Sequence, residues 1–221
     1  MTVVETELVA QPLSVVVREG SKAAHEQAEG TSFMSELLEG RLTEQAYADY
    51  LTGLRPVYEA LEQVGADLAG DPLVDAVRDV ALERLGAIDA DLAHWGRHAT
   101  PGLVSDATAA YAERIRAASA WGGLYVAHHY TRYLGDLSGG LAIGRIVGRT
   151  YGAGPEALAF YAFPGIEKPK PYKDAYRARL DAMPLDEGQK ARVLEEVRAG
   201  FALNTAFFAE LAARLDTYRA A

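Results

Sequence analysis

Apolar residues recur every three to four positions along most of the chain, and this spacing limits the folds that the chain can adopt. No segment alternates apolar and polar residues over a sustained run, and no Asn-Gly or Asp-Gly pair marks a hairpin turn. The pattern therefore predicts an all-α protein. Short gaps between the expected helices favour a compact helical bundle.

Start and stop residues divide the chain into expected helices. Pro12 suits a first helical turn, and Gly30 stops the helix that follows. Asp71 followed by Pro72 begins a later one. The main expected helices cover residues 12–29, 32–39, a longer stretch from 43, 72–97, 106–116, 123–151, 174–182 and 186–218. Residues 1–11 are expected to form a flexible tail, and 12–221 a single domain, because no repeat or linker interrupts them.

The charge and the composition exclude several classes of protein. A net charge of −9 and a pI near 5.1 disfavour a nucleic-acid-binding protein. No apolar run approaches the length of a membrane span, and no basic residue precedes Arg18 as a signal peptide requires, so we expect a cytoplasmic protein without a membrane anchor. The chain contains no cysteine, which excludes thiolate-held metals, iron–sulfur clusters and cysteine nucleophiles.

The segment YTRYLGDLSGGLAIGRIVG, residues 130–148, has helical leucine spacing but contains five glycines. Each glycine in a helix costs on the order of 1 kcal/mol relative to alanine. At helical periodicity the predicted core side consists of Ala127, Tyr130, Leu134, Leu137 and Leu141. The opposite side consists of Arg132, Gly135, Asp136, Gly139, Gly140 and Ile143. The glycines either end and restart the helix, or they let its backbone approach something broad and flat; the charged residues argue against a membrane-type helix dimer.

Two histidine arrangements are candidate ligand sites. Arg18, His25 and Glu29 share one helix face, and a carboxylate one turn after a histidine can orient a metal-bound imidazole. On a polar helix face the same residues can equally be ordinary surface groups. His94 and His98 are four residues apart, as in a zinc site, but the helix ends at this point, where histidines also complement the helix dipole.

Basic residues gather in EKPKPYKDAYRAR, where Lys173 and Arg177 are one turn apart and can reach one anionic group. A solvated basic face is the alternative. In GFALNTAFF, Phe201 and Asn204 are also one turn apart, and core packing accounts for them equally well.

Several of these segments occur in the order found in one family. HEQAE at His25, YTRYLGDLSGG from Tyr130, FPGI followed by KDAYRAR, and FALN near the end resemble the heme oxygenases of the soluble bacterial type. The resemblance runs from about Ser14 to Arg214. It implies a mostly α-helical fold that holds heme between a proximal helix and a kinked distal helix.

The resemblance also implies residue roles. His25 resembles the axial iron ligand, and Glu29 the carboxylate that interacts with it. Asp136 resembles the residue that orders the distal water network. The residues that match the distal backbone over the heme are Gly135, Gly139 and Gly140. Those near the heme propionates are Arg18, Tyr130, Lys173 and Arg177. Those of the distal network and pocket wall are Tyr58, Arg132, Asn204 and Phe201.

Two positions depart from the family pattern. The position of Arg18 is commonly lysine, and that of Ala24 is often threonine.

The implied reaction uses heme b as both substrate and cofactor and releases biliverdin, carbon monoxide and ferrous iron, with O2 as co-substrate. Because the chain lacks a redox centre of its own, electrons are expected from ferredoxin and ferredoxin reductase or another NAD(P)H-dependent reductase. A heme carrier without activity is the alternative, and the absence of a Glu-x-x-His pair argues against a di-metal oxygenase.

Overall fold

The structure is a computed structural model that describes residues 3–219. Within this range the chain forms helices and no β-strand, apart from an isolated bridge between Leu42 and Arg219, so the predicted all-α class is confirmed. The α-helices are α1 (Val3–Val9), α2 (Leu13–Gly20), α3 (Lys22–Glu29), α4 (Ser32–Leu38), α5 (Glu44–Asp67), α6 (Pro72–Val77), α7 (Leu85–Trp95), α8 (Asp106–Ala117), α9 (Gly122–His129), α10 (Leu141–Tyr151), α11 (Pro169–Asp181), α12 (Glu187–Ala212) and α13 (Leu215–Tyr218).

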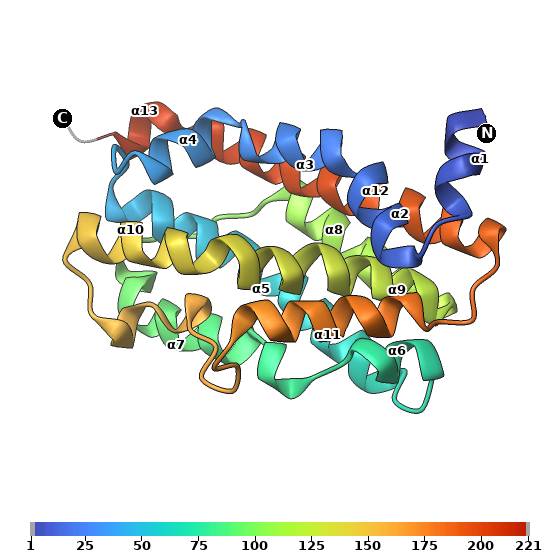
Figure 1. Cartoon of the computed structure of the whole chain (residues 1–221). Helices are drawn as coiled ribbons and strands as arrows, with labels where there is room; N and C mark the ends of the chain where they lie inside the picture. Colours follow the sequence, from blue (N-terminus) through green and yellow to red (C-terminus); the bar gives the residue numbers. More distant parts are fainter. Residues whose placement is uncertain (1–2, 220–221) are drawn as a thin grey trace.

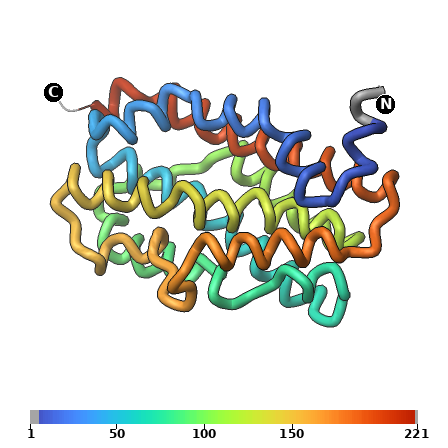
Figure 2. The backbone as a smooth tube through the Cα atoms, in the orientation of Figure 1, coloured from blue at the N-terminus to red at the C-terminus, as the bar shows by residue number. Residues whose placement is uncertain are grey.

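Two long helices, α5 and α12, form the frame of the bundle. Helix α8 packs against both of them, α7 packs against α5, and α3 and α9 pack against α12. In Figure 1, α9 and α10 run end to end across the middle of the molecule, α11 runs beside them, and α2 to α4 lie along the upper edge. The first and last helices, α1 and α13, lie at opposite ends of the bundle (Figure 2). This arrangement places α3 and the α9–α10 rod on neighbouring sides of α12.

Aromatic side chains fill the core between the long helices. The Tyr47 ring meets Trp95 edge to face with the centroids 5.4 Å apart, and Tyr50 stacks on Phe207 at 6.1 Å. Burying a large aromatic side chain contributes about 1.5–3 kcal/mol. The cluster therefore fixes α5 relative to α7 and α12, and with it the face of α5 that carries Tyr58.

The expected helix over residues 12–29 is divided at Ser21. The Ser21 backbone leaves the helical region, with φ −107° and ψ 2°, and its hydroxyl donates to the Val17 carbonyl at 2.6 Å. A Cβ at the preceding Gly20 would lie 2.6 Å from Leu194, so glycine allows α12 to approach closely here. The break turns α3 away from α2 and sets the direction of the face that carries His25.

The predicted flexible tail over residues 1–11 differs from the structure, in which Val3–Val9 form helix α1. Val9 is buried with Val16 and Leu194 in a small apolar cluster. Burial against α2 and α12 stabilises this helix, and periodicity in so short a segment did not reveal it. Residues 1–2 of the predicted tail lie outside the described residues.

The glycine-rich segment is not a regular α-helix. Between α9 and α10 the chain forms two π-helical turns, Tyr130–Leu134 and Asp136–Gly140, whose wider hydrogen-bond spacing changes the residue periodicity. Leu134 and Leu137 are buried as predicted, but Leu141 is 36% exposed. The placement of Leu141 in the core was wrong because it assumed α-helical periodicity across the π-helical turns.

His129, at the end of α9, joins this rod to α11. Its Nδ1 lies 2.9 Å from the Tyr176 hydroxyl, and the two rings stack at 5.7 Å with a 10° angle. Burial, helped by the charge of Arg179, lowers the pKa of His129 to about 3. The imidazole is therefore neutral at physiological pH, and it forms a hydrogen bond with the Tyr176 hydroxyl.

This histidine predicts acid-dependent loss of stability. Its pKa is lower in the folded state than the ordinary value of 6.5, so its contribution is complete above pH 6.5 and is lost as the pH falls toward 3. In urea titrations between pH 6 and 4, His129→Gln should flatten the fall in unfolding free energy by about 1.4 kcal/mol per pH unit. His94→Gln, at a partly exposed position of α7, is the control. An unchanged slope in His129→Gln would assign the acid sensitivity to other groups.

No helix among residues 3–219 combines the length and the apolar composition that a membrane crossing requires.

Candidate heme site

A buried polar cluster joins α5, the π-helical turns and α12. The Tyr58 hydroxyl donates a short hydrogen bond to Oδ2 of Asp136. Arg132 donates from Nη2 to the Tyr58 hydroxyl at 2.8 Å and from Nη1 to Oδ1 of Asn204 at 2.8 Å. Arg132 and Asp136 are 6% and 8% exposed, so the predicted distal residues meet in one network with little access to water.

Two factors set the pKa values in this cluster: burial, and the ion pair between Arg132 Nη2 and Asp136 Oδ1, which are 3.5 Å apart. Burial raises the pKa of Asp136, while the charge of Arg132 and the hydrogen bond from Tyr58 act in the opposite direction. Burial also disfavours the charge of Arg132, but Tyr58 and Asp136 raise its pKa well above the ordinary value. Arg132 stays charged, whereas Asp136 is a carboxyl group that can be protonated at a higher pH than an exposed one.

The glycines of the π-helical turns fall into two groups. A Cβ at Gly135 or Gly139 would meet nothing within 4 Å outside the local helix. A Cβ at Gly140 would lie 2.8 Å from the Tyr161 ring, and one at Gly144 would lie 2.9 Å from the same side chain. Gly140 is thus required for packing, whereas Gly135 and Gly139 leave an open stretch of backbone next to Asp136.

His25 projects from α3 with about half of its side chain exposed. Its Nε2 lies 3.6 Å from the Glu29 carboxylate, one turn later, as the spacing predicted. The imidazole meets the Phe201 ring edge to face at 5.4 Å. Phe201 thus supports one side of the ring, while the ring nitrogen that does not face Glu29 is free to bind a metal.

Two basic residues, Arg18 and Arg177, lie near Tyr130 at the other end of the site, and a third, Lys173, contacts the π-helical turns. The charges of Arg177 and Arg18 lower the pKa of Tyr130, although burial raises it more. Lys173 Nζ lies 3.1 Å from the Ser138 hydroxyl, so it reaches from α11 to the π-helical turns. This basic rim, defined as Arg18, Lys173 and Arg177, brings positive charge from α2 and α11 to one edge of the rod.

Helix α12 connects the two halves of the predicted site. Phe201 contacts His25, and Asn204, one turn later, accepts from Arg132. Residues three apart lie on the same side of a helix. His25 and the buried cluster around Arg132 therefore lie beside the same region, between α3 and the α9–α10 rod. In Figure 1, α3 lies above this rod.

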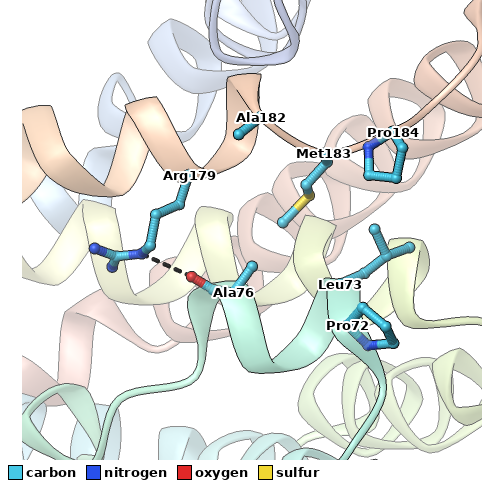
Figure 3. A pocket seen from close by; sticks show the side chains of 7 residues that line it. All are labelled: Pro72, Leu73, Ala76, Arg179, Ala182, Met183 and Pro184. Carbon is cyan, nitrogen blue, oxygen red and sulfur yellow. Dashed lines mark hydrogen bonds between the residues drawn. The ribbon is translucent and has the colours of Figure 1, made fainter.

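The alternative pair, His94 and His98, does not form a metal site. His94 packs against Trp95 with centroids 4.7 Å apart, and Nδ1 of His98 lies 3.2 Å from Glu44. Among the side chains that the structure describes, those of residues 6–219, no group of three or more His, Cys, Asp or Glu could hold a metal ion. A surface pocket of about 180 Å³ lies between α6 and α11, where Arg179 donates to the Ala76 carbonyl at 2.7 Å (Figure 3). None of the predicted site residues lines this pocket.

Sequence reasoning missed several groups beside the distal cluster. Burial raises the pKa of Tyr111 to about 12, while the nearby charge of Arg132 lowers it and that of Asp136 raises it. Burial lowers the pKa of Arg84, and the charge of Asp136 is the largest effect in the opposite direction. Tyr111 occurs in a predicted helix without any local signal of function. Only the packing of α8 on α5 and α12 brings it to the site.

Comparisons with known proteins all give the same family. The heme oxygenase family model matches residues 11–210. Heme oxygenase 1 of Synechocystis is 32% identical over 209 residues, which cover 92% of this chain and 86% of that protein. Heme oxygenase 1 of Rattus norvegicus is 34% identical over 216 residues, which cover 94% of this chain and 74% of that protein.

Solved structures agree with the sequence matches. The crystal structure of Synechocystis heme oxygenase-1 in complex with heme has a TM-score of 0.86 and 31% identity, and the match covers 94% of this chain and 95% of that one. The structure of heme oxygenase from Leptospira interrogans gives a TM-score of 0.85 and 31% identity, covering 90% and 100%. With a family match across most of its length, this chain belongs to the heme oxygenase family.

Proposed function

We propose that the chain is a heme oxygenase that opens the porphyrin ring of heme to biliverdin, carbon monoxide and ferrous iron, with O2 and electrons from an external donor. One observation carries the proposal. A buried carboxyl group, Asp136, lies next to glycine backbone that is open at Gly135 and Gly139. This arrangement can hold a proton close to a flat ligand without side chains between them.

The residues present fit heme b. His25 offers an accessible imidazole nitrogen, and Glu29 and Phe201 restrict the rotation of the ring. The basic rim supplies three cations for the two propionates, with Tyr130 beside it. Gly135 and Gly139 would lie against the face of the porphyrin. When bound, heme supplies both the iron that activates O2 and the ring that is oxidised.

The protein's own contribution is to orient the heme and to deliver protons. The Glu29 carboxylate lies 3.6 Å from Nε2 of His25, and its negative charge would raise the basicity of the imidazole as a ligand. On the distal side, Tyr58 and Arg132 hold the Asp136 carboxyl group in place, and Asn204 holds Arg132. Because burial raises the pKa of Asp136, its carboxyl group can bind and release a proton at a higher pH than an exposed aspartate.

The electron donor is a separate protein in this proposal. The chain has no cysteine and no G-x-G-x-x-G segment that would suggest a flavin or an iron–sulfur centre of its own. The basic rim of a chain with net charge −9 can attract an acidic donor such as ferredoxin to the heme edge, with ferredoxin reductase or another NAD(P)H-dependent reductase behind it. The expected cytoplasmic location and the single domain over residues 12–221 stay predictions.

The two glycine groups predict opposite effects of adding a methyl group. Gly139→Ala should leave the apoprotein as stable or up to about 1 kcal/mol more stable, because its Cβ meets nothing and alanine favours helix. Biliverdin formation should nevertheless fall about 100-fold, because the methyl group displaces the reacting groups from their positions. Urea unfolding and turnover of the same preparations measure both effects.

Gly140→Ala is the matched control. Its Cβ would lie 2.8 Å from Tyr161, so the apoprotein should lose about 1–3 kcal/mol of unfolding free energy. Wild-type turnover in Gly139→Ala would show that heme does not lie against this backbone.

The central experiment titrates the apoprotein with hemin and follows the absorption spectrum in air with ferredoxin, its reductase and catalase. Loss of the Soret band with release of biliverdin and carbon monoxide supports the proposal, since catalase removes free peroxide. A stable hemin complex that yields no biliverdin with a competent donor would contradict it. That outcome would favour the alternative, a heme carrier.

A further inference from the structure

The connection between α10 and α11 is largely irregular but lies partly in the interior of the protein. It contains two short 3-10 turns, Pro155–Ala157 and Ala159–Tyr161, and its residues Ala157, Phe160 and Tyr161 are at most 4% exposed. Such a segment satisfies only part of its own backbone hydrogen bonds, so other elements must supply partners for the rest. Here the partners come from α7, which lies beside the connection in Figure 1.

Asp91 of α7 holds the middle of this connection. Its carboxylate accepts from the backbone N–H groups of Ala159 at 2.7 Å and Phe160 at 2.9 Å. The side chain is fully buried, and burial raises its pKa, while the two N–H groups act in the opposite direction. Two hydrogen bonds to one carboxylate fix both the position and the direction of the two peptide groups.

Two further side chains bind the same connection. Trp95, one turn later in α7, donates from its indole N–H to the Ala157 carbonyl at 2.7 Å. Arg84, at the N-cap of α7, donates to the Ala162 carbonyl. Residues 157–163, the α7-bound segment, are therefore attached to α7 at three positions.

One side chain of the α7-bound segment reaches the buried cluster of the candidate site. Phe160 meets the Tyr58 ring edge to face, with the centroids 5.5 Å apart. Both side chains are fully buried, and the Tyr58 hydroxyl donates to the Asp136 carboxyl group. The Phe160 ring therefore limits where the Tyr58 ring can lie, and with it the hydrogen bond to Asp136.

The next side chain, Tyr161, packs against the glycines where the π-helical turns meet α10. It lies so close to the backbone that a Cβ at Gly140 would be 2.8 Å from it, and one at Gly144 would be 2.9 Å from it. The turn that carries Tyr161 packs against both the second π-helical turn and α10. Tyr161 therefore limits how far the glycine backbone can move toward α7.

We propose that Asp91 and Trp95 are positioning residues for the opening of the porphyrin ring. They act through the α7-bound segment, which brings Phe160 to Tyr58 and Tyr161 to the glycine backbone. The inference rests on the proposed function, because it concerns the turnover of bound heme. A displacement of reacting groups by about 1 Å can cost about 100-fold in rate, so a loosened segment should slow turnover without any direct contact to the ligand.

Asp91→Asn is the main test. The amide keeps the shape of the side chain, but its NH2 group faces one of the two backbone N–H groups, so one hydrogen bond is lost. Biliverdin formation per bound hemin should fall about 10- to 100-fold. The hemin dissociation constant should stay within about twofold, because the proposed ligand and the basic rim lie on α2, α3 and α11.

Asp49→Asn is the matched control. Asp49 is also fully buried, and its carboxylate accepts from the Thr100 backbone N–H at 2.6 Å and from the Tyr218 hydroxyl at 2.8 Å. It thus holds a different connection and α13. Both variants should lose stability in urea unfolding, but Asp49→Asn should turn over at the wild-type rate. Equal losses of turnover in the two variants would indicate a general effect of stability and overturn the proposal.

Hydrogen–deuterium exchange of the apoprotein tests the coupling without heme. In Asp91→Asn, exchange should become about two- to tenfold faster in residues 157–163 and also in residues 136–144, which include the glycine backbone. Asp49→Asn should leave both ranges unchanged. Faster exchange confined to residues 157–163 would show that the α7-bound segment does not hold the glycine backbone, and it would overturn the proposal.

Trp95→Phe serves as the test if Asp91→Asn does not fold. It removes the hydrogen bond to Ala157, keeps an aromatic ring beside Tyr47, and should lower turnover about two- to tenfold at unchanged hemin affinity. Wild-type turnover in Trp95→Phe would then refute the proposal.

Failure of this inference can be distinguished from failure of the proposed function. If the wild-type protein yields no biliverdin, the proposed function fails and the role of Asp91 in ring opening fails with it. If the wild-type protein yields biliverdin and Asp91→Asn turns over at the same rate, only the positioning role is refuted.

Discussion

Replacing His25 by alanine should reduce biliverdin formation by at least about 100-fold and leave the helical fold intact. Loss of a group that merely orients a metal ligand costs about 10- to 100-fold, so loss of the proposed ligand should cost at least as much. The side chain is about half exposed, and the change should alter the unfolding free energy by no more than about 0.5 kcal/mol. Turnover with the ferredoxin system and urea unfolding measure the two quantities.

Rescue by added imidazole tests directly whether His25 is the ligand. Imidazole can occupy the space left by the side chain and should restore part of the turnover of His25→Ala. His98→Ala is the matched control, since His98 also lies beside a carboxylate, Glu44 at 3.2 Å, but far from the proposed site in sequence and contacts. Wild-type turnover in His25→Ala, with or without imidazole, would remove His25 from the role of ligand.

Local sequence signals predicted most of the fold. The pair Asp71 and Pro72 begins α6 as expected, with the Asp71 carboxylate accepting from the Leu73 backbone at 2.8 Å. The helix expected over residues 106–116 begins at Asp106, and the residue before it, Ser105, caps it by accepting from the Thr108 backbone N–H at 3.1 Å. Such features depend on neighbours in sequence, which is why periodicity and capping rules locate them.

Features that depend on contacts between distant segments could not be predicted this way. The expected helix over 72–97 is divided: α6 ends at Val77, where the backbone of Arg78 becomes extended, and Arg84, between α6 and α7, is buried and donates to the Leu82 carbonyl at 3.0 Å. Leu141 is exposed because the π-helical turns change the residue periodicity. Neither event leaves a pattern in the local sequence.

The candidate site also combines features that local sequence predicts with features that depend on distant segments. The sequence placed Arg132 and Asp136 on the side opposite the leucines, and it placed His25 one turn before Glu29. Their burial and pairing depend on α5 and α12, which supply Tyr58 and Asn204 from 74 and 72 residues away in sequence. The family resemblance named Tyr58 and Asn204 through their positions in the matched motifs, whereas periodicity alone gave no reason to join them to Arg132.

Replacing Asp136 by alanine should separate heme binding from heme oxidation. Hemin binding should persist, because the proposed ligand His25 and the basic rim lie on other elements, α3, α2 and α11. Biliverdin formation should fall about 100- to 10,000-fold, which is the usual contribution of a positioned general acid. Hemin titration and product analysis on the same preparation measure both.

Asp136→Asn tests whether the Asp136 carboxyl group delivers a proton. Asparagine keeps the shape and can still accept the hydrogen bond from Tyr58, but it cannot deliver a proton, so the loss of turnover should be close to that of Asp136→Ala. Asp89→Asn, an exposed carboxylate paired with Arg55 at 2.7 Å, is the control and should turn over at the wild-type rate. If Asp136→Asn retained wild-type turnover, the carboxyl group would serve only to hold Tyr58 and Arg132, and the proton would have to reach the ligand by another route.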